Sequence, residues 1–201
     1  ATTTAIARPV PADNSVDAAD AVKFVATVDT GTIVSVVATN ATIIDAVATS
    51  TAPKTAVSGS STLSVNVGTG TTAEFYVYTK TTAIGTVAIT NGGTTTTYYV
   101  QGTKGKINSL TLTGVDSAAA GTAVTLTATA FDVFGNKVDG KGLTAIANGA
   151  TLTATTGTTG SALTDFGTVD FKFTAPATGP VTVVAYVTTS TDVETATTGF
   201  N

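Results

Sequence analysis

Few side chains in this sequence can carry acid, base, thiolate or metal chemistry near neutral pH. The chain of 201 residues has no His and no Cys, and its two glutamates, Glu74 and Glu194, lie more than a hundred positions apart. A glycosidase needs two carboxylates facing one cleft, and a nucleophilic enzyme needs a base beside its nucleophile. No motif in the sequence supplies either arrangement. We therefore predict that the chain is not an enzyme.

Cation binding through oxygen ligands is a second kind of chemistry to consider. Asp132, Asn136 and Asp139 lie within eight residues, and they offer the oxygen ligands that Ca²⁺ prefers. Asp and Asn side chains in a turn more often bond their own backbone. These three residues are thus the calcium candidates, with a metal-free turn as the favoured interpretation. No other cofactor is predicted.

The densest acidic group of the chain consists of Asp13, Asn14, Asp17 and Asp20. A solvated segment is the favoured interpretation. The alternative is a cation that links this region to a preceding domain, and a chelator would then lower the thermal stability.

Two features could carry sugars. Asn40-Ala41-Thr42 is the one Asn-x-Ser/Thr sequon, although such triplets arise readily by chance in a Thr-rich chain. The run Thr94–Thr97 could carry O-linked sugars, but a strand that starts after a hairpin turn also explains it. Asn40 is therefore the glycosylation candidate, and we favour a strand for the threonine run.

The tyrosines offer another binding surface. Tyr76 and Tyr78 alternate with apolar residues, which predicts that both lie on the outward face of a strand. Tyr98 is expected on a strand nearby. Exposed aromatic rings can stack on sugars or contact a protein, whereas a cross-strand pair that stabilises the sheet is the simpler alternative.

Composition limits the partners. About a quarter of the residues are Thr, charged residues make up 11%, and the net charge is −4. Nucleic acid is excluded as a partner because its phosphates require clustered Lys and Arg. Membrane insertion is excluded because no uninterrupted apolar run reaches about 18 residues. Without Cys there is no disulfide framework, so stability must come from hydrophobic cores.

Strand signals dominate the sequence, and helix signals are scarce. In Val124–Ala130 the apolar residues alternate with Thr, which puts one face of a strand on a core and the other in solvent. The same alternation occurs in Leu63–Val67, Val169–Phe173 and Val181–Val187. Asn91-Gly92 predicts a hairpin between strands over 86–89 and 97–100. The chain is therefore predicted to be all-β.

A glycine-flanked basic segment at 102–106 predicts a linker between two domains, residues 1–102 and 103–201. Each domain has about the length and strand number of an immunoglobulin-like sandwich. Pro9 and Pro11 cannot donate to a central sheet ladder, so the stretch up to about Asp20 is expected to be extended or an edge strand. The predicted fold is two tandem immunoglobulin-like antiparallel β-sandwiches.

The second domain carries three runs in a defined order. An alternating strand over 120–130 is followed by an Asp-x-x-Gly-Asn turn at 132–136, and a Gly-x-Val-Thr-Val-x-Ala strand follows over 179–185. In order and spacing, over about residues 107–189, these runs resemble the bacterial immunoglobulin-like domains of surface-layer proteins and of invasin- and intimin-type adhesins. Lys137 departs from the Pro that often follows the Asn in that family. The first domain matches only in the strand rhythm of 21–26 and 73–78.

The resemblance implies a structural module of a secreted prokaryotic cell-surface protein. The low charge favours a surface-layer (S-layer) protein that self-assembles into a lattice, located outside the cell in an S-layer or cell wall. Expected partners are neighbouring copies and, through domains outside this chain, cell-wall polymers. The alternatives are the stalk of a surface adhesin and an accessory carbohydrate-binding module of an extracellular hydrolase.

Overall fold

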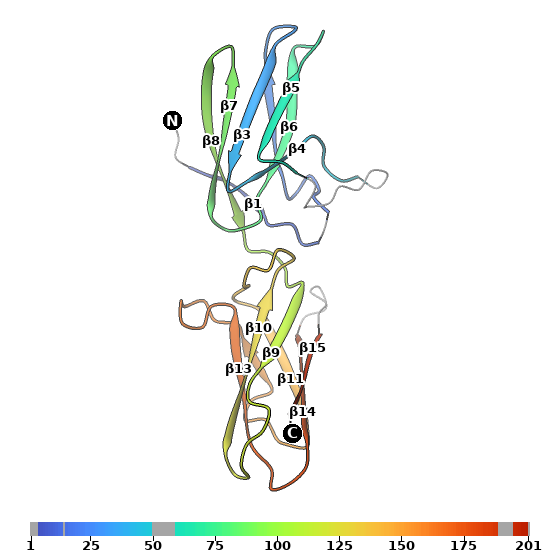
Figure 1. Ribbon diagram of the computed structural model, residues 1–201, viewed down its shortest axis with the longest axis vertical. Coiled ribbons are helices and arrows are strands. Elements are labelled where there is room, and N and C mark those ends of the chain that lie inside the picture. Colours follow the sequence, from blue (N-terminus) through green and yellow to red (C-terminus); the bar gives the residue numbers. More distant parts are fainter. Residues whose placement is uncertain (1–3, 14, 50–58, 189–194, 201) are drawn as a thin grey trace. The chain divides into compact units, whose positions relative to one another are not determined.

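A computed structural model describes residues 4–13, 15–49, 59–188 and 195–200, the last range by its backbone alone. These residues form fifteen strands and no helix, which confirms the all-β prediction. No helix in the described part of the chain therefore has the length and apolarity needed to cross a membrane. The chain divides into two compact units, Ala1–Gly105 and Lys106–Asn201, called here the first and the second unit. Each unit consists of facing sheets (Figure 1).

The first unit contains a five-stranded sheet, β1-β8-β7-β3-β5, and a three-stranded sheet, β2-β6-β4. Its strands are β1 (Ile6–Pro9), β2 (Val22–Thr27), β3 (Ile33–Thr39), β4 (Thr42–Ile44), β5 (Thr62–Asn66), β6 (Thr72–Tyr78), β7 (Ile84–Asn91) and β8 (Thr94–Thr103). All pairings are antiparallel except that of β1 with β8, which is parallel. Strand β8 reaches Thr103, where it pairs with Pro9, so this unit continues past the predicted boundary at residue 102.

The core of the first unit lies between its two sheets. Phe24 and Phe75 of the smaller sheet stack with ring centroids 5.4 Å apart, and they pack with Val34, Val36 and Val87 of the larger sheet. Burial of this apolar surface is the main stabilising term of the unit.

The hairpin between β7 and β8 confirms the turn prediction. Gly92 and Gly93 have φ angles of 55° and 84°, and a two-residue turn of type I′ requires a positive φ at both central positions. The threonine run that follows belongs to β8, as favoured from the sequence.

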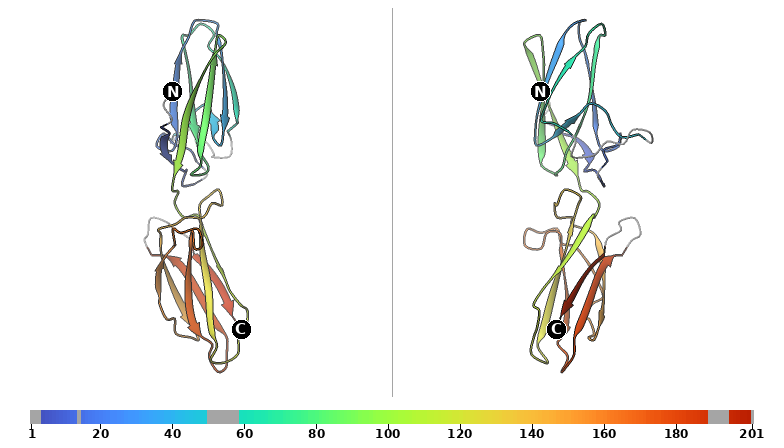
Figure 2. Two further views of the ribbon diagram at one scale, coloured as in Figure 1. Left: turned by 90° about the vertical axis from the view of Figure 1, so that its left-hand side faces the viewer. Right: turned by 45° about the vertical axis from the view of Figure 1, so that its right-hand side comes forward.

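The second unit contains the sheets β13-β10-β9 and β12-β11-β14-β15, with every pairing antiparallel. Its strands are β9 (Ser109–Thr113), β10 (Ala123–Phe131), β11 (Gly142–Asn148), β12 (Thr156–Thr158), β13 (Thr168–Thr174), β14 (Val181–Val187) and β15 (Thr195–Phe200). Leu126, Phe171 and Phe173 of one sheet pack against Leu143 and Val183 of the other. Both units are therefore antiparallel sandwiches of the predicted class, and Figure 2 shows the layers of each from two further sides.

Candidate functional site

In the five-stranded sheet of the first unit, the outer face formed by β5, β3, β7 and β8 is uncharged. In β3 the side chains of Val34 and Val36 are buried, whereas Ile33 and Val37 point outward with 59% and 48% of their surface exposed. Because side chains alternate along each strand, the register assigns the outward residues of the neighbouring strands as well. The outward set is Ile33, Ser35, Val37 and Thr39 of β3, Ile84, Thr86, Ala88 and Thr90 of β7, Thr95, Thr97, Tyr99 and Gln101 of β8, and Thr62, Ser64 and Asn66 of β5. None of these side chains is charged.

Polar groups of this face bond locally. Thr90 Oγ1 and Thr95 Oγ1 lie 2.8 Å apart, and the Gln101 side-chain amide donates to the carbonyl oxygen of Thr82 at 2.9 Å. The face can therefore meet another uncharged surface without removing an ion from water, which is the costly step in burying charged surfaces.

The smaller sheet of the first unit has a charged outer face. Lys23 Nζ lies 2.9 Å from Glu74 Oε2, and both side chains are about half exposed. The hydrogen bond to Glu74 raises the pKa of Lys23 above its ordinary value. The Lys23 ammonium group also lies 6.0 Å from the ring centre of Tyr76. Of the two sheets described in this unit, the larger one thus offers the neutral contact surface.

The residues of the uncharged face were not singled out from the sequence. A signal was available in Val36-Val37, where two adjacent apolar residues break the alternation. One of them must then lie on the outer face. Which strands adjoin it depends on long-range pairing, which a local pattern does not contain.

Two of the three calcium candidates, Asp132 and Asn136, are hydrogen-bonded to each other in the structure. Asp132 is buried, and its Oδ1 accepts hydrogen bonds from the backbone N–H groups of Phe134 and Asn136 at 2.9 and 2.8 Å. Its Oδ2 accepts from Asn136 Nδ2 at 2.8 Å. The two residues thus form the self-bonded turn that was the favoured interpretation. Asp139 is buried farther along the same connection. A calcium ion held by Asp132, Asn136 and Asp139 stays a prediction.

Part of the N-terminal acidic group also bonds its own backbone. Asp13 Oδ1 accepts from Ser15 N, and Asp17 Oδ1 accepts from Ala19 N, both at 2.7 Å. Asn14 lies outside the described residues. No group of three or more acidic, His or Cys side chains that could hold one metal ion occurs in the described ranges.

The glycosylation candidate Asn40 lies in the exposed turn between β3 and β4, with a φ of 53°. Asn tolerates this left-handed conformation better than most residues. Sugar attachment at Asn40 stays a prediction.

The tyrosine prediction is partly wrong. Tyr76 lies on the outer face of β6, as expected, but Tyr78 is only 1% exposed. Val77 and Tyr78 are both buried, so the outer face of this sheet is covered where β6 ends, and alternation predicts exposure only where one face meets water. Tyr98 lies on β8, where its ring contacts Phe24 edge-on with centroids 5.4 Å apart.

Comparisons with known proteins give likenesses of fold. No family model matches the chain. No curated protein matches it either. Among solved structures, the D0-D1 domain of intimin matches at 19% identity over 98% of this chain and 95% of its own, with a TM-score of 0.36. Invasin, described as a bacterial integrin-binding protein, matches at 18% identity over 97% of this chain and 38% of its own, with a TM-score of 0.42.

A surface-layer protein is also among the neighbours. Domains 4 and 5 of the S-layer protein SbsC match at 19% identity over 59% of this chain and 64% of their own, with a TM-score of 0.37. Adhesins and surface-layer proteins are the two classes that the sequence runs of the second domain resemble. At these identities the likeness concerns the fold alone.

Proposed function

We propose that this chain is a structural module of a secreted prokaryotic cell-surface protein, most specifically of an S-layer protein, in which copies associate through the uncharged face. The single observation that carries the proposal is that face itself, defined by the outward residues of β5, β3, β7 and β8. The same proposal places the protein outside the cell and assigns it no catalytic role.

The size of the face fits repeated weak contacts. Four strands about 4.8 Å apart and about seven residues long give a surface roughly 15 Å by 20 Å. A stable interface of standard size buries about 800 Å² on each partner. One such contact is therefore weak, and an array gains strength by repeating it, since linked contacts add avidity without new chemistry.

The test is assembly of the 201-residue chain, followed by sedimentation velocity and electron microscopy over a range of protein and salt concentrations. We expect assemblies that persist at high salt, because screening weakens charged contacts and not neutral ones. Val37→Lys should abolish these assemblies. Val115→Lys, at another exposed apolar position with the same change in charge, should leave them intact.

Dispersed particles under every salt condition would overturn the lattice proposal and favour an adhesin stalk. Binding of the chain to a glycan array would instead favour the carbohydrate-binding alternative, with Tyr76 and Tyr98 as the first residues to replace. Loss of assembly in both lysine variants would show that net charge, and not the face, controls association.

A further inference from the structure

Among the residues that the structure describes, strand β2 of the first unit pairs on one side only, and its other side is called here the β2 edge. The strand is the first of its sheet, and its partner is β6. Val28 N donates to Thr71 O at 2.9 Å, and antiparallel bonding repeats every two residues. The backbone groups of Val22, Phe24 and Ala26 therefore face β6. Those of Lys23, Val25 and Thr27 face the β2 edge.

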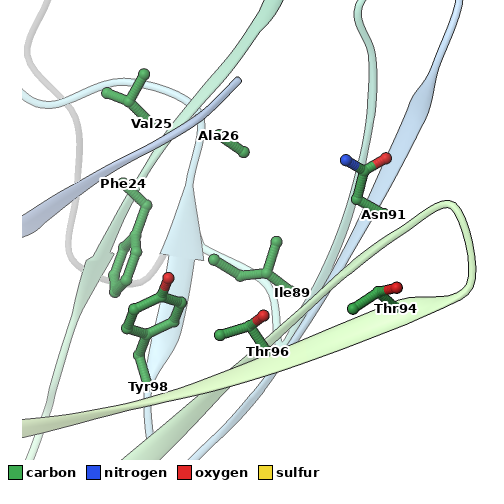
Figure 3. A pocket seen from close by; sticks show the side chains of 8 residues that line it. All are labelled: Phe24, Val25, Ala26, Ile89, Asn91, Thr94, Thr96 and Tyr98. Carbon is green, nitrogen blue, oxygen red and sulfur yellow. The ribbon is translucent and has the colours of Figure 1, made fainter. Parts of the chain in front are cut away.

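A groove lies beside this edge. Its volume is about 320 Å³. Figure 3 shows that the rings of Phe24 and Tyr98 lie side by side, with Ile89 and Thr96 next to them. Val25 and Tyr98 are 53% and 41% exposed, although both are large apolar or aromatic residues. No charged residue lines the groove. Its lining residues are Phe24, Val25, Ala26, Ile89, Asn91, Thr94, Thr96 and Tyr98.

The second unit shows what covers such an edge. Strand β10 is the second strand of its unit, as β2 is of the first unit, and its antiparallel pairing with β13 corresponds to that of β2 with β6. On its other side β10 pairs with β9. Leu110 and Leu112 of β9 are buried in the core. In the second unit, the antiparallel strand β9 therefore covers the edge of β10. In the first unit, no described residue pairs with the corresponding edge of β2.

Charge does not protect the β2 edge. Lysine on an edge strand commonly prevents edge-to-edge pairing. Lys23 is the one charged residue of β2. Its ammonium group forms an ion pair with Glu74 of β6, on the side of β2 that is away from the β2 edge. The edge thus lacks the usual barrier against another strand.

We propose that β2 pairs antiparallel with β2 of a second copy, around a two-fold axis at Val25. This dimer goes beyond the proposed function, because it uses a different surface. With Val25 opposite itself, Lys23 lies opposite Thr27 of the second copy, so the two lysines do not meet. Phe24 lies opposite Ala26 of the second copy, which sets a large inward side chain against a small one. Residues 23, 25 and 27 then form three hydrogen-bonded pairs.

The register can be tested by crosslinking, because the chain contains no Cys. Residues opposite each other in a hydrogen-bonded pair have Cα atoms about 5.5 Å apart, within the range of about 4.4–6.8 Å that a disulfide accepts. Val25→Cys should therefore form a covalent dimer under mild oxidation. Thr27→Cys is the control, because its two copies would lie about 14 Å apart along the strands. Equal crosslinking of both variants, or no dimer from Val25→Cys, would overturn the proposal.

A second measurement tests the same pairing without Cys. Val25→Pro removes an N–H that faces the edge and leaves the bonds to β6 in place, a substitution that edge strands tolerate. We expect the dimer dissociation constant from sedimentation equilibrium to rise about tenfold or more, because the two-fold axis makes the substitution remove two interstrand hydrogen bonds at once. Circular dichroism checks that the variant is folded. An unchanged dissociation constant in a folded variant would contradict the proposal.

The two proposals fail separately. Val37→Lys lies on the uncharged face and should remove large assemblies while the Val25→Cys dimer still forms. Loss of that crosslink in the double variant Val25→Cys, Val37→Lys would show that the contact forms through the face and would overturn edge pairing. A wild-type chain that is monomeric at all concentrations would overturn both proposals, whereas the two variants above distinguish between them.

Discussion

The two units use their first strands differently, and the difference decides whether the second strand of each unit lies at the edge of its sheet. In the first unit, β1 joins the larger sheet and runs parallel to β8. In the second unit, β9 joins the smaller sheet and runs antiparallel to β10. Three later pairings correspond between the units: β2–β6 with β10–β13, β3–β7 with β11–β14, and β7–β8 with β14–β15. Strand β4, which pairs with β6, has no counterpart among the described strands of the second unit. The position of one short strand therefore separates a unit whose second strand is paired on both sides from a unit whose second strand is paired on one side among the described residues.

The residues of the two first strands explain this choice. All four residues of β1 are exposed, and Pro9 at its end has no N–H to donate. In β9, Leu110 and Leu112 alternate with Ser and Thr, and both leucines are buried. A strand with two inward leucines gains about 1.5–3 kcal/mol for each buried side chain. Strand β1 has no fully buried side chain of this kind.

The largest expected effect comes from the central aromatic residue of each core. Phe75→Ala should lower the free energy of unfolding of the first unit by about 3–5 kcal/mol, because it leaves a cavity and removes the stack on Phe24. Phe171→Ala should do the same to the second unit. Urea titration followed by the amide NMR signals of each unit measures both. The described cores share no residue, so equal loss in both units from either variant would contradict this prediction.

The next effect tests the anchoring of the first strands. Leu112→Ala should cost the second unit about 2–5 kcal/mol, the usual range for a buried leucine. Ile6→Ala in β1 should cost the first unit less than about 1 kcal/mol, because Ile6 is already exposed. The same urea titration applies. Comparable losses from the two substitutions would mean that β1 is anchored by contacts that its exposure does not reveal.

Local chemistry made part of this architecture predictable. Alternation identified strands such as Val124–Ala130, and Asn91-Gly92 identified the β7–β8 hairpin, because both signals act between neighbours in sequence. Which sheet the first strand of each unit joins depends on pairing between residues distant in sequence, and it was not predicted. The same limit applies to Tyr78, whose burial depends on segments distant in sequence, and to the uncharged face, which exists only once four strands adopt their register.

A smaller effect compares corresponding turns. Asp132 lies between β10 and β11, and Asp29 lies between β2 and β3. Asp132→Ala should cost the second unit about 1–3 kcal/mol, because it leaves the N–H groups of Phe134 and Asn136 without their acceptor. Asp29→Ala, at an exposed position, should change the first unit by less than about 0.5 kcal/mol.

Calcium changes the expected result for Asp132. If the turn acts without metal, the loss in Asp132→Ala is the same with added Ca²⁺ and with a chelator, as judged by thermal unfolding. A wild-type protein that is stabilised by Ca²⁺, with no such gain in Asp132→Ala, would instead establish the cation site at Asp132, Asn136 and Asp139.

The smallest effect appears only at alkaline pH and again separates the units. Burial raises the pKa of Tyr78 above its ordinary value of 10.0, because the buried phenolate would lose its hydration. A folded-state pKa above the unfolded one means that the folded state holds the proton more tightly. This contribution to stability is complete below pH 10.0 and is lost as the pH rises through the folded value.

Tyr78→Phe removes the ionisable group, so it should flatten the alkaline decline of the first unit and leave the second unit unchanged. Urea titrations at pH values on both sides of the ordinary tyrosine pKa, followed by the NMR signals of each unit, measure the difference. Because the phenol is neutral at pH 7, the two proteins should show no pH-dependent difference there. An alkaline decline of equal steepness in wild type and Tyr78→Phe would assign the loss to other groups and would show that the Tyr78 hydroxyl reaches water when it ionises.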